Sequence, residues 1–192
     1  MKVVAFMGSP RKNGNTARLT EMVLGEVRAA GHEAQRFDIC GEPLRGCTAC
    51  MGCYTKKDRR CVVTSDRVNE WITAMDGADA ILLASPTYFA NVSAEMKALI
   101  DRAGFVAKVN GDMFRRKVGA GIVAVRRSGA APVFDAMNRF FLIGQMVVPG
   151  SSYWNLGVGL EPGDVEGDAE GVETMRTLGT NLVWAMEGLA KR

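Results

Sequence analysis

The chain has 192 residues, of which 47% are hydrophobic and 23% charged, and its formal net charge is +3. This composition indicates a globular protein with one sizeable core, and the length is too short for two comfortable domains. The charge is too small to indicate nucleic-acid binding, and no apolar stretch approaches the roughly 20 residues that span a bilayer. Because the N-terminus reads as a strand and has no signal-peptide pattern, we expect a cytoplasmic protein without membrane or nucleic-acid partners.

In the first half of the chain, apolar runs alternate with helical patterns. A buried strand is predicted over 2–7, a helix over about 15–30 and a short edge strand over 32–39. The segment 40–63 has no regular pattern, and a helix over about 66–75 follows it. His32, the only histidine, follows Gly31 at a probable helix end, where an exposed turn residue is expected. A mechanism that needs a histidine base is nearly excluded.

The second half of the chain continues the alternation. A strand over 78–85 precedes a helix that Ser93 caps, that runs to Arg102 and that Gly104 should stop. A strand over 117–125 precedes a helix with Pro132 in its first turn, which ends near Gly144. A last short strand is predicted over 146–148, a long connection over 149–168 and a final helix over 169–190.

Strict alternation of five strands with helices predicts a single α/β domain over 1–192. We expect a flavodoxin-like, doubly wound parallel sheet of order 2-1-3-4-5 with helices on both faces. Ligands of such sheets bind at the carboxyl ends of the strands. The loops predicted there are 8–15, 40–63, 85–92, 126–131 and 149–168.

The loop after the first strand has the composition of an anion site. Backbone N–H groups at a helix N-terminus point outward unpaired, and the helix dipole favours negative charge. The loop matches neither G-x-x-x-x-G-K-[ST] nor G-x-G-x-x-G, so it fits a single terminal phosphate better than an NTPase or dinucleotide site. The alternative is a plain polar turn. The candidate ligands are Ser9, Arg11, Asn13, Gly14, Asn15 and Thr16.

Two further loops could hold a planar ring. An aromatic pair and a stiff proline between a strand and a helix can support one ring face, while amide and hydroxyl groups bond its polar edge. The alternatives are aromatic side chains that shield a sheet edge and arginines that are simply solvated. The candidates are Pro86, Thr87, Tyr88, Phe89 and Asn91 in one loop and Arg126, Arg127 and Gly129 in the other.

These motifs together resemble a known family. Gly-Ser-Pro-Arg-x-x-Gly-Asn-Thr, the run Ser85-Pro-Thr-Tyr-Phe and the run Ser93-Ala-Glu-Met-Lys-Ala-Leu-Ile-Asp-Arg are similar to those of the NADPH-dependent FMN reductase group of flavodoxin-like proteins. The resemblance implies FMN as cofactor, with its phosphate on Ser9, Arg11, Asn15 and Thr16 and its ring against the 86–91 and 126–129 loops. It also implies homodimers or homotetramers. The long connection over 149–168, with Tyr153 and Trp154, could form an arm across a neighbouring subunit, and the alternative is a loop folded back over its own sheet.

Four cysteines at compact spacing suggest a second cofactor. Cys47, Cys50 and Cys53 form C-x₂-C-x₂-C, and Cys61 follows after seven residues. Such runs wrap iron–sulfur clusters, whereas zinc usually takes two separated C-x₂-C knuckles, and an odd cysteine count argues against a disulfide framework. The run is similar to that of the iron–sulfur flavoproteins of anaerobes, which bind FMN and a [4Fe–4S] cluster. Free thiols are the alternative, and Cys40 is the spare cysteine.

The sequence therefore favours an FMN-dependent oxidoreductase that passes electrons between FMN and a [4Fe–4S] cluster. No side chain is expected to act as acid or base, because the chemistry would take place at N5 of FMN. NAD(P)H or a ferredoxin-like carrier would be the donor, and a small oxidised molecule the acceptor. Lys56, Lys57, Arg59 and Arg60 would attract an acidic carrier. One alternative is a cluster-free NAD(P)H-dependent FMN or quinone reductase, and another is a non-enzymatic flavin carrier or redox sensor.

Overall fold

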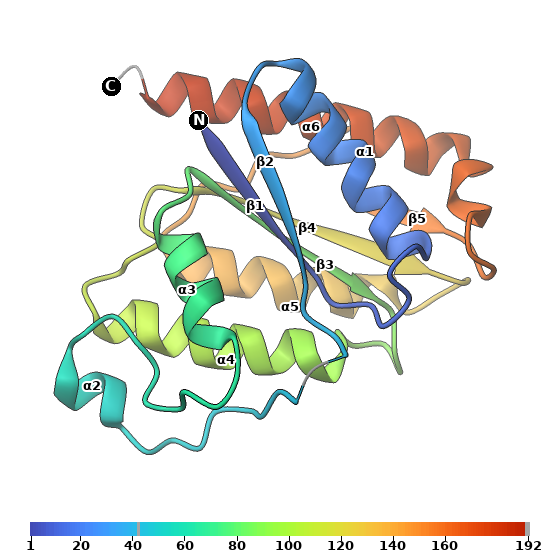
Figure 1. The fold of residues 1–192 in the computed structure, drawn as a ribbon. Helices are drawn as coiled ribbons and strands as arrows, with labels where there is room; N and C mark the ends of the chain where they lie inside the picture. Colours follow the sequence, from blue (N-terminus) through green and yellow to red (C-terminus); the bar gives the residue numbers. More distant parts are fainter. Residues whose placement is uncertain (42, 191–192) are drawn as a thin grey trace.

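Five parallel strands form one sheet in the order β2-β1-β3-β4-β5, which confirms the predicted flavodoxin-like topology (Figure 1). The computed structural model describes residues 1–41 and 43–190; Glu42, inside the predicted 40–63 segment, lies outside the described residues, as do Lys191 and Arg192. The strands are β1 (Lys2–Met7), β2 (Glu33–Asp38), β3 (Ala80–Pro86), β4 (Val118–Val125) and β5 (Leu156–Val158).

Helices cover both faces of the sheet (Figure 1). Helices α1 (Asn15–Ala29) and α6 (Ala169–Ala190) pack on one face, and α3 (Val68–Asp76), α4 (Ala94–Val109) and α5 (Ala130–Ile143) pack on the other. Each face therefore has its own hydrophobic core. None of the described helices is long and apolar enough to cross a membrane.

The burial of the strands follows from their place in the sheet. Strands β3 and β4 are central, and their residues are buried almost without interruption, as a parallel sheet covered on both faces requires. Strand β2 is an edge strand with alternating exposure, and its Phe37 stacks on Phe6 with ring centroids 5.2 Å apart. This stack joins the edge strand to the core.

The predicted strand over 146–148 is wrong. Val147 makes only an isolated bridge to Val118, whereas β5 lies further along the chain and pairs with Val123–Val125. The chain thus reaches the β4 edge twice, and only the second contact extends into a strand. Gly157 lets β5 pack closely under α1, because a Cβ there would lie 2.6 Å from Leu19 Cδ2.

Two helix boundaries also differ from the sequence prediction. Gly104 does not end α4, which continues to Val109. Gly104 faces the Phe140 ring of α5, from which a Cβ would lie 3.4 Å away, an ordinary contact distance. The 40–63 segment is also not wholly irregular, since it contains the short helix α2 (Gly52–Lys56).

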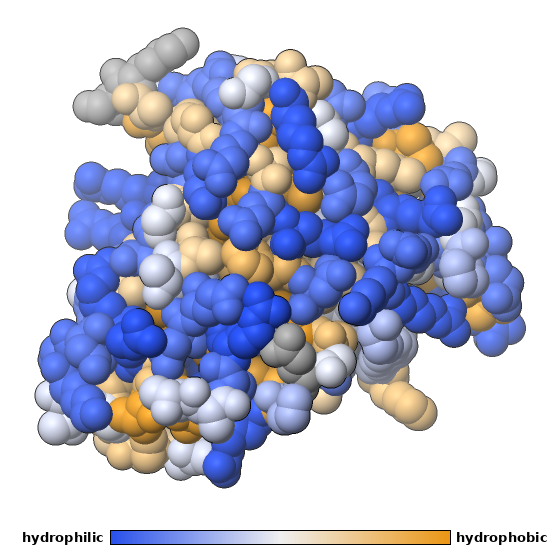
Figure 2. Space-filling model, in the orientation of Figure 1, coloured by the Kyte–Doolittle hydropathy of each residue, from blue (hydrophilic) through white to orange (hydrophobic). Residues whose placement is uncertain are grey.

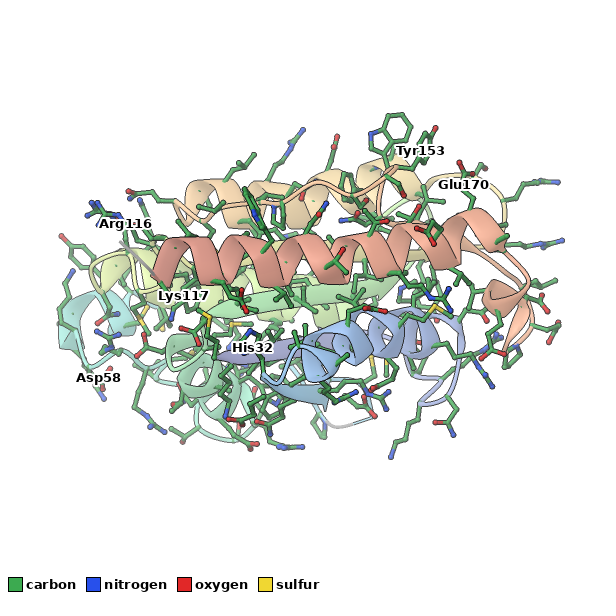
Figure 3. All side chains as sticks on the ribbon, turned by 90° about the horizontal axis from the view of Figure 1, so that it is seen from above. His32, Asp58, Arg116, Lys117, Tyr153 and Glu170 are labelled. Atoms are coloured by element: carbon green, nitrogen blue, oxygen red, sulfur yellow. The ribbon has the colours of Figure 1, made fainter. Side chains whose placement is uncertain are left out.

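Most of the predicted arm over 149–168 folds back on its own subunit. Asn181 donates to the Gly150 carbonyl at 2.8 Å, and the Gly163 N–H donates to Asn15 Oδ1 at 2.8 Å. The short 3₁₀ helix η1 (Asp164–Glu166) lies in the same stretch. Tyr153 and Trp154 remain about half exposed, with ring centroids 5.0 Å apart, and Figure 3 shows Tyr153 at the rim of the molecule. The exposed apolar side chains of this stretch also include Val158 and Leu160.

Candidate functional site

The loop between β1 and α1 has the geometry of an anion site. Gly14 caps α1 in an extended conformation and without a side-chain cap, so the first backbone N–H groups of the helix are left for a ligand. Ser9 and Thr16 are buried, and Ser9 Oγ accepts the Arg11 N–H at 3.2 Å, which fixes the turn. Gly8 is needed for close packing, because a Cβ there would lie 2.9 Å from Ser93 Oγ.

Two of the predicted phosphate ligands contact the segment after β5. Arg11 Nη1 donates to the Leu160 carbonyl at 3.3 Å, and Asn15 Oδ1 accepts the Gly163 N–H at 2.8 Å. Asn13 is exposed, and its backbone carbonyl accepts a hydrogen bond from Arg18 Nε at 3.4 Å. These contacts shape the loop. The buried hydroxyls of Ser9 and Thr16 and the first amides of α1 remain as its candidate donors to a ligand.

The predicted ring-binding loop forms a tight turn over Tyr88–Asn91. The backbone groups of Tyr88 and Asn91 bond each other twice at 3.0 Å, with Phe89 and Ala90 both in the left-handed region at φ 48° and 56°. Phe89 is fully exposed at the tip and Tyr88 is 45% exposed. Because left-handed φ values are costly for residues other than glycine, this turn has the local strain often found in ligand-binding loops.

The loop after β4 meets the turn through Gly129. Gly129 adopts φ +86°, and a Cβ there would lie 3.3 Å from Ala90 Cβ and 3.4 Å from Thr87 Cγ2. Arg126 and Arg127 are both exposed beside it. The structure thus brings Thr87, Ala90 and Gly129 together, whereas the side chains of both arginines are exposed.

These three loops fit a flavin phosphate in their chemistry. Residues 8–16, 85–92 and 126–131 include no Asp or Glu, while Arg11, Lys12, Arg126 and Arg127 carry positive charge. Thr87 Oγ1 is buried without a hydrogen-bond partner among the described residues. A buried hydroxyl without a partner is unfavourable, so a polar ligand atom beside it would lower the free energy of the site.

The four cysteines of the 47–61 run line one pocket. Gly46, Cys47, Cys50, Cys53 and Cys61 face it together with residues of α4, and Cys40 is not among its lining residues. Cys47 and Cys50 are exposed, Cys61 is half-buried and Cys53 is buried. Among the described residues, no three His, Cys, Asp or Glu side chains are arranged to hold a single metal ion.

The backbone around these cysteines turns sharply. Ala49 and Met51 have φ values of 51° and 58°, and the Ala49 N–H donates to Cys47 Sγ at 3.5 Å. The backbone N–H of Gly52 and the side chain of Thr48 lower the pKa of Cys50, whereas burial raises the pKa of Cys53. Thiolates are the form that binds metal, and amides aimed at sulfur stabilise that form. Four cysteines around one pocket, two of them beside backbone amides, are a donor set that fits an iron–sulfur cluster, and the raised pKa of Cys53 is the one feature that opposes thiolate formation.

The cysteine pocket lies away from the other loops, although the whole 40–63 segment was predicted to stay at the carboxyl end of the sheet. Helix α2 packs at the far end of α4, where Lys57 Nζ donates to the Val109 carbonyl at 2.5 Å. In Figure 3, Asp58 of this segment and Glu170 of α6 lie at opposite ends of the molecule. Ser93 begins α4 beside the first loop, so Arg102 and Val106 lie about 14–20 Å further along the helix.

Three buried polar residues behind the cysteine pocket were not predicted as site residues. Asn69 accepts the Cys61 N–H at 2.7 Å and donates to the Cys61 carbonyl at 2.9 Å. Arg102 is 1% exposed and pairs with Asp66. A signal was present in the sequence, since Arg102 falls on the same helical face as the buried Leu99 and Val106, where a charge is unusual.

The sheet order and the loop after β1 define a protein of the flavodoxin-like class. Solved structures support this fold. That of RosB with a bound 8-demethyl-8-formylriboflavin-5'-phosphate intermediate matches with a TM-score of 0.76 and 15% identity, covering 100% of this chain and 81% of that chain. A flavodoxin from the domain Archaea matches with a TM-score of 0.62 and 14% identity over 97% of this chain and 99% of that chain.

The chain belongs to the NADPH-dependent FMN reductase family, whose profile matches residues 1–161. This is a family of FMN-dependent oxidoreductases, in agreement with the resemblance found in the sequence. Among curated proteins, one named an iron–sulfur flavoprotein, of Methanocaldococcus jannaschii, is 35% identical over 198 residues, covering 100% of both chains.

Proposed function

We propose that this protein passes electrons between FMN and a [4Fe–4S] cluster held by Cys47, Cys50, Cys53 and Cys61. The observation that carries the proposal is the single pocket that all four cysteines line, although seven residues separate the last two along the chain. The iron–sulfur flavoprotein name of the Methanocaldococcus jannaschii relative supports the same function.

The FMN phosphate would lie at the N-terminus of α1. Ser9, Thr16 and the first amides of α1 would donate hydrogen bonds to it, and Arg11 would add positive charge. Thr87 and the Tyr88–Asn91 turn would bind the ring, with Arg126 and Arg127 supplying positive charge nearby. FMN supplies two-electron chemistry at N5 and can release electrons singly, whereas a [4Fe–4S] cluster moves one electron at a time.

The donor would be NAD(P)H or an acidic ferredoxin-like carrier, and the final acceptor a small oxidised molecule. The surface near α2 suits the carrier. Lys56 and Arg60 are exposed and, among the described residues, their side chains have no hydrogen-bond or ion-pair partner, whereas Arg59 pairs with Asp76. Figure 2 shows hydrophobic surface over this segment, at the lower left, with hydrophilic residues around it. Charge around an apolar centre is typical of transient protein contacts.

Anaerobic purification followed by iron, sulfide and FMN analysis tests the proposal. We expect about four iron and four sulfide per FMN, with a broad absorbance near 400 nm that bleaches on reduction. Cys50→Ser should lose the iron and keep FMN, because the two sites lie apart along α4. Cys40→Ser is the matched control, and it should keep both. Wild-type protein with FMN but no iron or sulfide would contradict the cluster.

The description of the family favours a second candidate, a cluster-free NAD(P)H-dependent FMN or quinone reductase. It predicts that Cys50→Ser, free of iron, oxidises NADH or NADPH with a quinone as fast as the wild type does. Under the cluster proposal, the same variant keeps FMN but loses electron transfer to one-electron acceptors. Steady-state assays with a quinone and with ferricyanide separate the two candidates.

A further inference from the structure

Arg102 is a fully buried cation on the inner face of α4. Its side chain is 1% exposed, and that of Asp66, its ion-pair partner, is 5% exposed. Removing a charge from water costs several kcal/mol unless pairing and hydrogen bonds offset it. A buried charge of this kind is unusual, so we ask which groups around it use its hydrogen bonds.

The guanidinium ties the cysteine segment to α4 at several points. Both terminal nitrogens contact the Asp66 carboxylate, with Nη2 3.1 Å from Oδ1. Nη1 donates to the Arg45 carbonyl at 3.2 Å, and Nη2 donates to the Val63 carbonyl at 3.3 Å. All these partners lie between residues 45 and 66, on either side of the cysteines. One side chain thus holds both ends of the segment.

The same guanidinium reaches a cysteine. Nη2 lies 3.5 Å from Cys61 Sγ, and Arg102 lines the pocket that the four cysteines share. Its Nε–H is buried and has no acceptor among the described residues. Burial opposes the charge of Arg102, but hydrogen bonds and attraction from Asp66 and Cys61 outweigh burial and raise its pKa. Arg102 is therefore a permanent cation in the wall of the cysteine pocket, in contact with one of the four cysteines and with one donor left unpaired.

We propose that Arg102 is a positioning residue for the cluster, which holds Cys61 in place and raises the reduction potential through its fixed charge. This role rests on the proposed function. A cluster with four thiolate ligands gains one negative charge when one electron enters from a reductant, and a nearby cation stabilises the reduced form more than the oxidised one. The carboxylate of Asp66, which pairs with Arg102, offsets part of this effect.

Two substitutions separate the charge of Arg102 from its hydrogen-bonding fork. Arg102→Gln removes the charge, and Arg102→Lys keeps the charge but not the planar fork. Arg176→Gln, on the exposed face of α6, is the control for the loss of one positive charge. Each anaerobically purified protein is titrated with dithionite and redox mediators while the cluster is followed by electron paramagnetic resonance. Iron and FMN contents are measured on the same samples, and hydrogen exchange reports the order of 45–63.

The reduction potential should separate the variants. For Arg102→Gln we expect at least a tenfold fall in the equilibrium constant for reduction, which is 59 mV for a one-electron couple. Arg102→Lys should stay near the wild-type potential but show faster hydrogen exchange over 45–63. Arg176→Gln should match the wild type in both measurements.

The outcomes distinguish the two proposals. If the wild type contains the cluster and Arg102→Gln has the same reduction potential as Arg176→Gln, the role of Arg102 is overturned and the proposed function stands. Wild-type protein without iron or sulfide overturns both. If Arg102→Gln does not fold, Arg102→Lys decides: unchanged exchange over 45–63 overturns the positioning role, and faster exchange with an intact FMN content supports it.

Discussion

Thr87 carries a hydroxyl that is unfavourable without a ligand. Its Oγ1 is buried and has no partner in the described part of the chain. Thr87→Val should therefore leave the stability of the FMN-free protein unchanged, or raise it by up to about 1 kcal/mol. It should weaken FMN binding about three- to tenfold, because one hydrogen bond to the ligand is lost. Thermal unfolding and fluorescence titration with FMN measure the two effects.

Thr20→Val is the control for this substitution. Thr20 is also buried, but its hydroxyl donates to the Thr16 carbonyl at 2.8 Å. Its replacement should lower the stability of the FMN-free protein by about 1 kcal/mol. Equal FMN affinity in wild type and Thr87→Val would show that FMN does not bond the Thr87 hydroxyl.

Cys40 should make the free energy of unfolding fall with rising pH in the alkaline range. Burial, and then the charge of Glu95, raises the pKa of this thiol from 9.0 to about 12. In the unfolded chain the thiol loses its proton near pH 9, whereas in the folded protein it keeps the proton up to about pH 12. The free energy of unfolding is therefore unaffected by this group below pH 9 and falls as the pH rises towards 12. At about pH 11 the loss is about 2–3 kcal/mol. Urea unfolding across this range should give a steeper decline for wild type than for Cys40→Ala, and parallel declines would contradict it.

At the scale of the elements, α4 is the helix that serves both candidate sites. Ser93 caps it beside the first loop, with its Oγ accepting the Met96 N–H at 3.2 Å, and Arg102 and Val106 lie at the cysteine pocket. Gly104 of α4 faces the Phe140 ring of α5. The packing of this one helix against α3 and α5 therefore supports both sites.

Glycines in this layer should respond to alanine in opposite directions. At Gly104 a Cβ would lie 3.4 Å from the Phe140 ring, which is an ordinary contact, so Gly104→Ala should stabilise by up to about 1 kcal/mol through helix propensity. At Gly119 on β4 a Cβ would lie 2.5 Å from Phe141 Cδ1, so Gly119→Ala should destabilise by about 1–3 kcal/mol. Chemical denaturation measures both, and a destabilising Gly104→Ala would show that the two helices cannot adjust.

At the scale of the whole molecule, the two candidate sites lie at different ends of α4, and the basic surface near α2 lies at the cysteine end. A reduced acidic ferredoxin should therefore transfer electrons to this end, and the rate should fall about tenfold or more as ionic strength rises. Replacing both Lys56 and Arg60 with alanine should lower the rate at low salt and flatten the salt dependence. Stopped-flow absorbance measures the transfer.

The control variant replaces Arg139 and Arg176, which are exposed on α5 and α6, with alanine. It changes the net charge equally and should keep the wild-type salt dependence. A rate independent of salt in the wild type would exclude electrostatic steering of the carrier.

The sequence by itself determined the order of the sheet, most helix boundaries and the family. Continuous apolar runs such as Val3–Phe6 and Ile81–Ala84 are local patterns, and the alternation of strands with helices leaves few topologies. Loop motifs at the ends of those runs identify the candidate ligands for the same reason. Each of these features depends on residues that are close in the chain.

Only the tertiary structure decided which residues meet. The edge strand formed at Leu156–Val158 and not at 146–148, because pairing depends on where the chain returns to β4 and not on its local apolarity. Gly104 proved to lie inside α4, where it faces Phe140, 36 residues away in the chain. The same holds for Arg102, whose partners Asp66, Arg45 and Cys61 come from a distant segment. Contacts between distant residues depend on the whole fold, and no local pattern records them.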